Sequence, residues 1–123
     1  IQLTLVQRMK LDGVVIVSTP QEIALIDARR AAEMFRKTET PILGVIENMA
    51  FFVDATGARV PIFGQGGATA EAERLNVPVL AEVPIEVALR ESGDRGRPYV
   101  ATAPDAPAAK AFMAAAKTLA AGF

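Results

Sequence analysis

The 123-residue chain contains no cysteine, no histidine and no tryptophan. Without thiols or imidazoles it cannot form a disulfide, bind zinc through Cys and His, or use a cysteine nucleophile or a histidine general base. No apolar run approaches the roughly 18 residues that span a bilayer, and the net charge of -1 provides no basic field for nucleic acid. Because 51% of the residues are hydrophobic, we expect a folded, soluble, cytoplasmic protein with no nucleic-acid or membrane partner.

Two apolar runs with a helical pattern between them predict a βαβ unit. GVVIV at 13–17 and ILGVIE at 42–47 have the composition of strands that are covered on both faces. Thr19 and Glu22 have the spacing of a capping box, which places Pro20 at the first helical position. The helix that follows has apolar residues at helical spacing, namely Leu25, Ala28, Ala32 and Phe35.

The rest of the chain continues the alternation of strands and helices. The two β-prone arms of FFVDATGARVPIF predict a hairpin that turns at Gly57. A glycine-rich stretch, GQGGATAEAERL, then enters a helix, and VPVLAEV at 77–83 is a third strand of the buried type. We expect helices also over IQLTLVQRMK at 1–10, from Pro84 through IEVALRES, and over the last segment, capped by Asp105 or a neighbour.

This order predicts an α/β fold: a partial doubly wound, mainly parallel sheet with flanking helices and a β-hairpin excursion near 51–63. Ligands of such folds bind at the carboxyl ends of the strands, which here read STPQE, ENM and VPIE. Asn48 therefore lies where a ligand is expected. The alternative is that Asn48 only turns the chain after a strand, which is a common use of asparagine.

Several segments together resemble one protein family. LDGVVIVSTPQEIALIDARRAAEMF, PILGVIENMAFF, IFGQGGA and VPVLAEVPIEVALRESGDRGRP resemble, in the same order, the C-terminal half of the Mrp/ApbC-type iron-sulfur carrier P-loop ATPases. That family is related to MinD, ParA and the nitrogenase iron protein. The resemblance implies that residues 1–123 are the C-terminal part of a single P-loop ATPase domain, with the N-terminal Walker A half absent.

The resemblance also implies a site. In that family the asparagine of ENM contacts adenine, so Asn48 is the expected adenine reader, and Pro84, Ile85 and Glu86 are expected to line the base pocket. The complete family protein binds ATP with magnesium, hydrolyses ATP, forms a homodimer and serves iron-sulfur client proteins. An amide agrees with the adenine role, because it offers both a donor and an acceptor.

Two departures from the family pattern limit what this chain does by itself. GQGGA continues with Ala68 and Thr69, so it is no Walker A loop, and we expect the chain alone to be inactive, with no catalytic residue and no metal ligand. Many relatives carry Cys-x-x-Cys after ENM, where this chain reads VDATG. Neither Asp54 nor Thr56 is a soft donor, so an iron-sulfur cluster would have no cysteine ligand in this chain.

Two acidic pairs have both a functional and a structural interpretation. By resemblance, Glu22 and Asp27 lie near the dimer interface and the nucleotide, but helix-terminus carboxylates on a solvated face are the alternative. Glu91 and Asp94 suggest acid/base chemistry, but the neighbouring arginines favour surface ion pairs.

The resemblance therefore implies that the chain is part of an ATP-binding, ATP-hydrolysing iron-sulfur cluster carrier or assembly protein, in which it supplies the adenine pocket and a dimer surface. One alternative is half of a MinD/ParA-like positioning ATPase. A membrane partner for it is disfavoured because Lys110 and Lys117 are the only cations of the last helix. The other alternative is a non-catalytic interaction module.

Overall fold

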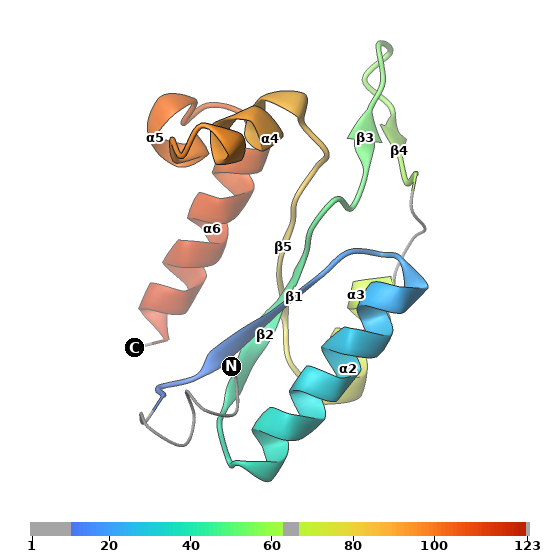
Figure 1. Cartoon of the computed structure of the whole chain (residues 1–123), viewed down its shortest axis with the longest axis vertical. Helices are drawn as coiled ribbons and strands as arrows, with labels where there is room; N and C mark the ends of the chain where they lie inside the picture. Colours follow the sequence, from blue (N-terminus) through green and yellow to red (C-terminus); the bar gives the residue numbers. More distant parts are fainter. Residues whose placement is uncertain (1–10, 63–66, 123) are drawn as a thin grey trace.

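A three-stranded parallel sheet forms the centre of the computed structural model, which describes residues 11–62 and 67–122 (Figure 1). Its strands are β1 (Val14–Ser18), β2 (Ile42–Glu47) and β5 (Val79–Glu82), in the order β1-β2-β5. The parallel order predicted from the alternation of strands and helices is thus confirmed. The helix expected at 1–10 and the residues 63–66 of the glycine-rich stretch lie outside the described residues.

Helices cover both faces of this sheet, and a separate core lies under each layer (Figure 1). On one face, α2 (Glu22–Lys37) and α3 (Gly67–Leu75) pack over a cluster centred on Ile16 and Val45. On the other face, α4 (Val87–Asp94), α5 (Tyr99–Thr102) and α6 (Pro107–Ala121) pack over Ile46 and Val83. Successive residues of a strand point to opposite faces. Val45 therefore packs in the core under α2 and α3, and Ile46 packs in the core under α4, α5 and α6.

The helix α2 presents the apolar face that its spacing predicts, with Ala28, Ala32 and Phe35 buried. Small alanines let the helix lie close to the sheet. At its far end, the Arg36 guanidinium donates a hydrogen bond of 2.6 Å to the carbonyl oxygen of Leu75. A basic side chain thereby satisfies a carbonyl at the C-terminus of α3, where the helix dipole favours positive charge.

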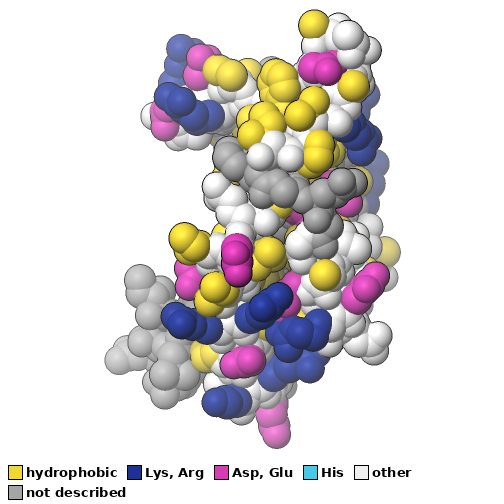
Figure 2. Space-filling model, turned by 90° about the vertical axis from the view of Figure 1, so that its right-hand side faces the viewer, with side chains coloured by type: hydrophobic (Ala, Val, Ile, Leu, Met, Phe, Trp, Pro, Cys, Tyr) yellow, Lys and Arg dark blue, Asp and Glu magenta, His cyan; other side chains and the backbone are white. Residues whose placement is uncertain are grey.

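The hairpin β3 (Phe52–Val53) and β4 (Arg59–Val60) confirms the excursion predicted after ENM. Its turn contains Gly57 at φ +84°, a left-handed conformation that glycine adopts readily. The hairpin projects from the body of the molecule in Figure 1, and Figure 2 shows hydrophobic side chains gathered at this end. At least four large apolar residues of this region are exposed, namely Phe52, Val53, Val60 and Ile62.

The helix caps predicted from sequence are wrong. The chain stays extended at Gln21, so α2 begins at Glu22, and Thr19 Oγ1 donates to Gln21 Oε1 instead of capping the helix. A capping box needs its glutamate at the third helical position, whereas Glu22 is the first. Likewise α6 begins at Pro107 after Ala106, and Asp105 does not cap it. The short helix α5 falls after the predicted loop GDRGRP and was not expected.

None of the helices within 11–62 and 67–122 is long and apolar enough to cross a membrane.

Candidate adenine site and acidic cavity

The carboxyl ends of the three strands form one row across the sheet. Ser18 is in register with Glu47, and Glu47 is in register with Glu82. This edge is where ligands bind in open α/β sheets, as the sequence analysis expected. Ser18 and Glu47 are buried at 5% and 4% exposure, whereas Glu82 is exposed, so the row runs from the interior of the fold to its surface.

Asn48 follows β2 directly and is half-buried at this edge. Its main-chain N–H donates to the Ser18 carbonyl over 2.8 Å, and its side-chain Oδ1 accepts a 3.0 Å bond from the Met49 N–H. Met49 has a left-handed φ of +51°, which is uncommon for a residue other than glycine. The side chain thus turns the chain, as the structural alternative predicted. The Oδ1 atom keeps a second lone pair, and the side-chain NH₂ has no hydrogen-bond partner among the described residues.

The segments that follow β2 and β5 run side by side. Ala50 donates to the Val83 carbonyl over 2.9 Å, and Ile85 donates to the Phe51 carbonyl over 2.8 Å. These bonds hold residues 84–86 beside the chain that leaves Asn48. The fold therefore brings together the segments of all four residues expected around adenine, although they are far apart in sequence.

Glu86 makes two hydrogen bonds within the fold that the sequence did not predict. Its Oε1 accepts a 2.9 Å bond from the Tyr99 hydroxyl, and its Oε2 accepts a 2.6 Å bond from the Ala108 N–H. The carboxylate therefore caps the N-terminus of α6 from 22 residues away, at a helix end that favours an anion. The hydrogen bond to Glu86 raises the pKa of Tyr99, with a contribution from burial. Glu86 thus joins α4, α5 and α6, and its carboxylate is directed toward those helices.

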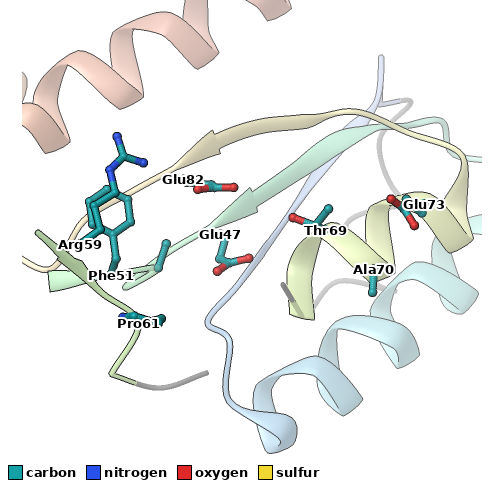
Figure 3. Close-up of a pocket in the computed structure, with 9 residues that line it drawn as sticks. Glu47, Phe51, Arg59, Pro61, Thr69, Ala70, Glu73 and Glu82 are labelled. Carbon is teal, nitrogen blue, oxygen red and sulfur yellow. The ribbon is translucent and has the colours of Figure 1, made fainter. Parts of the chain in front are cut away.

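A cavity of about 430 Å³, the acidic cavity, lies on the other side of the same strand ends. Figure 3 shows Glu47 between residues of the hairpin and residues of α3. The lining residues are Glu47, Ala50, Phe51, Arg59, Pro61, Thr69, Ala70, Glu73 and Glu82. None of the residues expected around adenine lines this cavity. Glu47 and Glu82 were not among the residues predicted to form a site, although both end apolar strands.

Glu47 has an unusual electrostatic environment for a glutamate. Among the described residues its Oε2 has no hydrogen-bond partner, and the side chain is 4% exposed. Burial raises the pKa of Glu47, the negative charge of Glu82 raises it further, and the Ala68 N–H at the start of α3 offsets part of the increase. Desolvation and a like charge both favour the protonated form of a carboxyl group.

The hairpin tip does not fit an iron-sulfur cluster. One carboxylate oxygen of Asp54 accepts hydrogen bonds from the Thr56 N–H, the Thr56 hydroxyl and the Ala58 N–H. These bonds lower the pKa of Asp54, the Thr56 hydroxyl contributing most. That oxygen is already engaged by the turn, and the chain has no cysteine. Clusters prefer thiolate ligands, so any such ligands would come from outside this chain.

The other acidic candidates lie on the surface. Glu22 and Asp27 are both exposed on α2. Arg90 and Asp94 form an exposed ion pair of 3.8 Å, which agrees with the ion-pair interpretation of that segment. Within 11–62 and 67–122, no group of three or more Asp, Glu, His or Cys residues could hold a metal ion.

Solved structures define the class of protein. The nucleotide-binding protein of Archaeoglobus fulgidus, solved in complex with ADP, matches with a TM-score of 0.66 and 40% identity over 77% of this chain and 40% of that one. The MinD cell division protein of Aquifex aeolicus matches with a TM-score of 0.70 over 98% of this chain and 47% of that one. At 21% identity the MinD match shows the fold alone. The fold is that of the MinD-related P-loop NTPases.

The family follows from sequence comparison. The family model described as ParA, NUBPL iron-transfer P-loop NTPase, matches residues 1–120. The iron-sulfur cluster carrier protein of Deinococcus radiodurans is 47% identical over 98% of this chain and 34% of its own length. The iron-sulfur cluster transfer protein NUBPL of Dictyostelium discoideum is 43% identical over 95% of this chain and 36% of its own. The chain belongs to the NUBPL iron-transfer family of P-loop NTPases, and it spans about a third of the length of these curated relatives.

Proposed function

We propose that this chain is part of an ATP-binding, ATP-hydrolysing iron-sulfur cluster carrier, in which it supplies the adenine pocket and a dimer surface. The family membership and the ADP-bound relative support nucleotide binding. The homodimer, the iron-sulfur client proteins and the cytoplasmic location belong to the proposal. The phosphate cradle and the magnesium ligands lie, on this proposal, outside the described residues.

The geometry of Asn48 carries this proposal. Adenine presents a donor and acceptors on its edge, and an amide can pair with both. The bond from the Met49 N–H to Oδ1 fixes the orientation of the amide while it uses only one lone pair of that oxygen. Asn48 therefore turns the chain and presents its NH₂ group at the strand ends. The two roles that the sequence left open are compatible in one side chain.

The substitution Asn48→Asp separates the two roles. Aspartate keeps the oxygen that accepts from the Met49 N–H but has no NH₂ donor. In the whole protein, we expect Asn48→Asp and Asn48→Ala each to weaken ATP binding by about 1 to 3 kcal/mol, because adenine loses a buried partner. Calorimetric titration with ATP and GTP measures this loss.

Preference for ATP over GTP should fall in both variants. If Asn48→Asp binds ATP as the wild type does and only Asn48→Ala is impaired, Asn48 acts through the turn alone, and its adenine role is wrong.

A MinD/ParA-like positioning role is supported here by likeness of fold only. We therefore do not prefer it.

A further inference from the structure

The acidic cavity holds a buried carboxylate oxygen without a partner. Glu47 Oε2 is bonded to none of the described residues, and the side chain lines the cavity at 4% exposure. Buried polar groups in proteins are almost always hydrogen-bonded, because an unsatisfied one is costly. Because Glu47 Oε2 has no partner and its side chain lines the cavity, a ligand in the cavity could donate a hydrogen bond to it.

A second carboxylate stands beside it. Glu47 and Glu82 are partners in the parallel register of β2 and β5, and both line the cavity. Like charges opposite each other on neighbouring strands repel and destabilise the pair. Figure 3 shows the two carboxylates on adjacent strands, with Thr69 and Glu73 of α3 on one side. A ligand that carries positive charge would relieve both the repulsion and the missing hydrogen bond.

The charge and shape of the remaining wall favour a cation with an apolar part. The cavity is lined by three carboxylates and one cation, Arg59. The Arg59 guanidinium lies over the Phe51 ring at 4.4 Å from its centroid, and no ion pair within 11–62 and 67–122 joins Arg59 to a carboxylate. The arginine therefore rests on an aromatic face. Phe51, Pro61 and Ala50 provide apolar surface between the hairpin and Glu47.

We propose that the acidic cavity binds a guanidinium or primary ammonium group, with Glu47 and Glu82 as acceptors and the Phe51–Pro61 wall against its alkyl chain. A planar guanidinium can donate to two carboxylates at once, so it is favoured over ammonium. The volume of about 430 Å³ suits a small organic ligand. Although three carboxylates line the cavity, no group of three acidic residues within 11–62 and 67–122 is arranged to hold a metal ion. The site is separate from the adenine residues, so it goes beyond the proposed function.

Binding of such a cation requires Glu47 to be ionised. The groups that face it in the cavity are Glu82, Glu73 and Arg59, and only the first two share its sign. Because the pKa of Glu47 is raised in the free cavity, affinity for the cation should fall as the pH is lowered through that raised pKa. Binding near that pKa should release a proton.

The test compares two ligands of nearly equal shape in the whole protein: n-butylguanidinium, which is charged, and n-butylurea, which is neutral. Titrations followed by the amide resonances of Ala50 and Phe51 should show saturable binding of the guanidinium alone. Glu47→Gln and Glu82→Gln should each weaken it about tenfold or more, since each removes a charge-assisted hydrogen bond. Glu33→Gln, an exposed site on α2, is the matched control and should leave binding unchanged.

Thermal unfolding of each variant confirms that it is folded. A guanidinium that binds no better than the urea, or that binds Glu47→Gln as well as the wild type, would overturn the proposal. The same titration with agmatine and with a blocked Gly-Arg-Gly peptide distinguishes a small-molecule guanidinium from an arginine side chain of a protein, according to which binds more tightly. None of the residues expected around adenine lines the cavity, so the ATP titrations of the Asn48 variants test the adenine site, the guanidinium titrations test the cavity, and either can fail alone.

Discussion

Two buried glutamates near α3 have opposite environments. Glu71 is 2% exposed, and its carboxylate binds Arg29 from α2 and Arg74 from its own helix. Glu47 is 4% exposed, has an oxygen without a partner among the described residues, and faces Glu82. Hydrogen bonds from Arg74, with those from Arg29, lower the pKa of Glu71, whereas burial and Glu82 raise that of Glu47.

The Glu71 carboxylate therefore stabilises the fold, whereas the Glu47 carboxylate lowers its stability when ionised. Glu71 joins α2 to α3 through ion pairs to half-exposed arginines, so its role is complete within the chain. Glu47 gains nothing comparable from the described residues. A carboxylate in a cleft whose pKa is raised by burial and a like charge is a candidate for function, whereas ion-pair networks perturb pKa values for structural reasons.

The largest effect is expected from Glu71→Gln. The substitution removes the charge and turns an amide NH₂ toward arginine donors, so the free energy of unfolding should fall by about 1.5 to 3 kcal/mol. Arg29 and Arg74 are 54% and 45% exposed, so water can solvate them and limit the loss. Chemical denaturation at neutral pH measures the change. Glu91→Gln, an exposed site on α4, is the control and should change it little.

The pH dependence of this effect has a definite sign. The pKa of Glu71 is lowered in the folded state, so its stabilisation is present above the ordinary value of 4.5 and is lost as the pH falls through the folded value. The difference in free energy of unfolding between the wild type and Glu71→Gln should therefore become smaller in acid. If this difference in free energy stays constant with pH, the ion pairs of Glu71 are not its cause.

A smaller effect of opposite sign is expected from Glu47→Gln. Removing a buried charge beside Glu82 should leave the free energy of unfolding unchanged at pH 7 or raise it by about 1 kcal/mol. The folded pKa is raised, so the penalty begins as the pH rises above 4.5 and is complete above the folded value. Chemical denaturation at several pH values should show that, as the pH is lowered, the free energy of unfolding of the wild type increases relative to that of the variant. A clear loss of stability at pH 7 would show that Glu47 has a stabilising partner besides the Ala68 N–H.

A further substitution apportions the pKa of Glu47 between its causes. Glu82→Gln removes the like charge but not the burial, and burial is the larger cause. The pKa of Glu47 should therefore move down without returning to 4.5. NMR titration of the side-chain carboxyl carbon measures this. A complete return to the ordinary value would make repulsion, and not desolvation, the dominant cause.

The smallest effect is expected at Asp54, a carboxylate whose partners are all within one turn. Asp54→Ala removes three hydrogen bonds from the hairpin tip. Because the tip is exposed, we expect faster amide hydrogen exchange at Thr56 and Ala58 with little change in global stability. Exchange that is unchanged at both amides would show that the backbone alone maintains the turn.

Periodicity and turn chemistry were sufficient to predict most of the fold. The β-branched runs became parallel strands, and Ala28, Ala32 and Phe35 became the buried face of α2. The hairpin followed from two β-prone arms around Gly57. These features depend on residues close together in the chain, which a single sequence reveals.

The features that the sequence did not reveal depend on distant or irregular contacts. The carboxylate that caps α6 comes from Glu86, 22 residues away, whereas the local sequence predicted a cap from Asp105 or a neighbour. The pairing of Glu47 with Glu82 follows an irregularity in register between Val45 and Ile46, which shifts the facing residue on β5. Strand alternation alone does not predict such a shift. The acidic cavity was therefore found only in the structure.

The most direct test is a side-chain carboxyl titration of Glu47 and Glu71 in the same protein sample, followed by carbon-detected NMR. The account predicts that the pKa of Glu47 lies above 4.5 and that of Glu71 lies below it. A pKa of Glu47 at or below 4.5 would contradict this. It would mean that the buried carboxylate already has its hydrogen-bond partners within the protein and does not need a ligand to supply them.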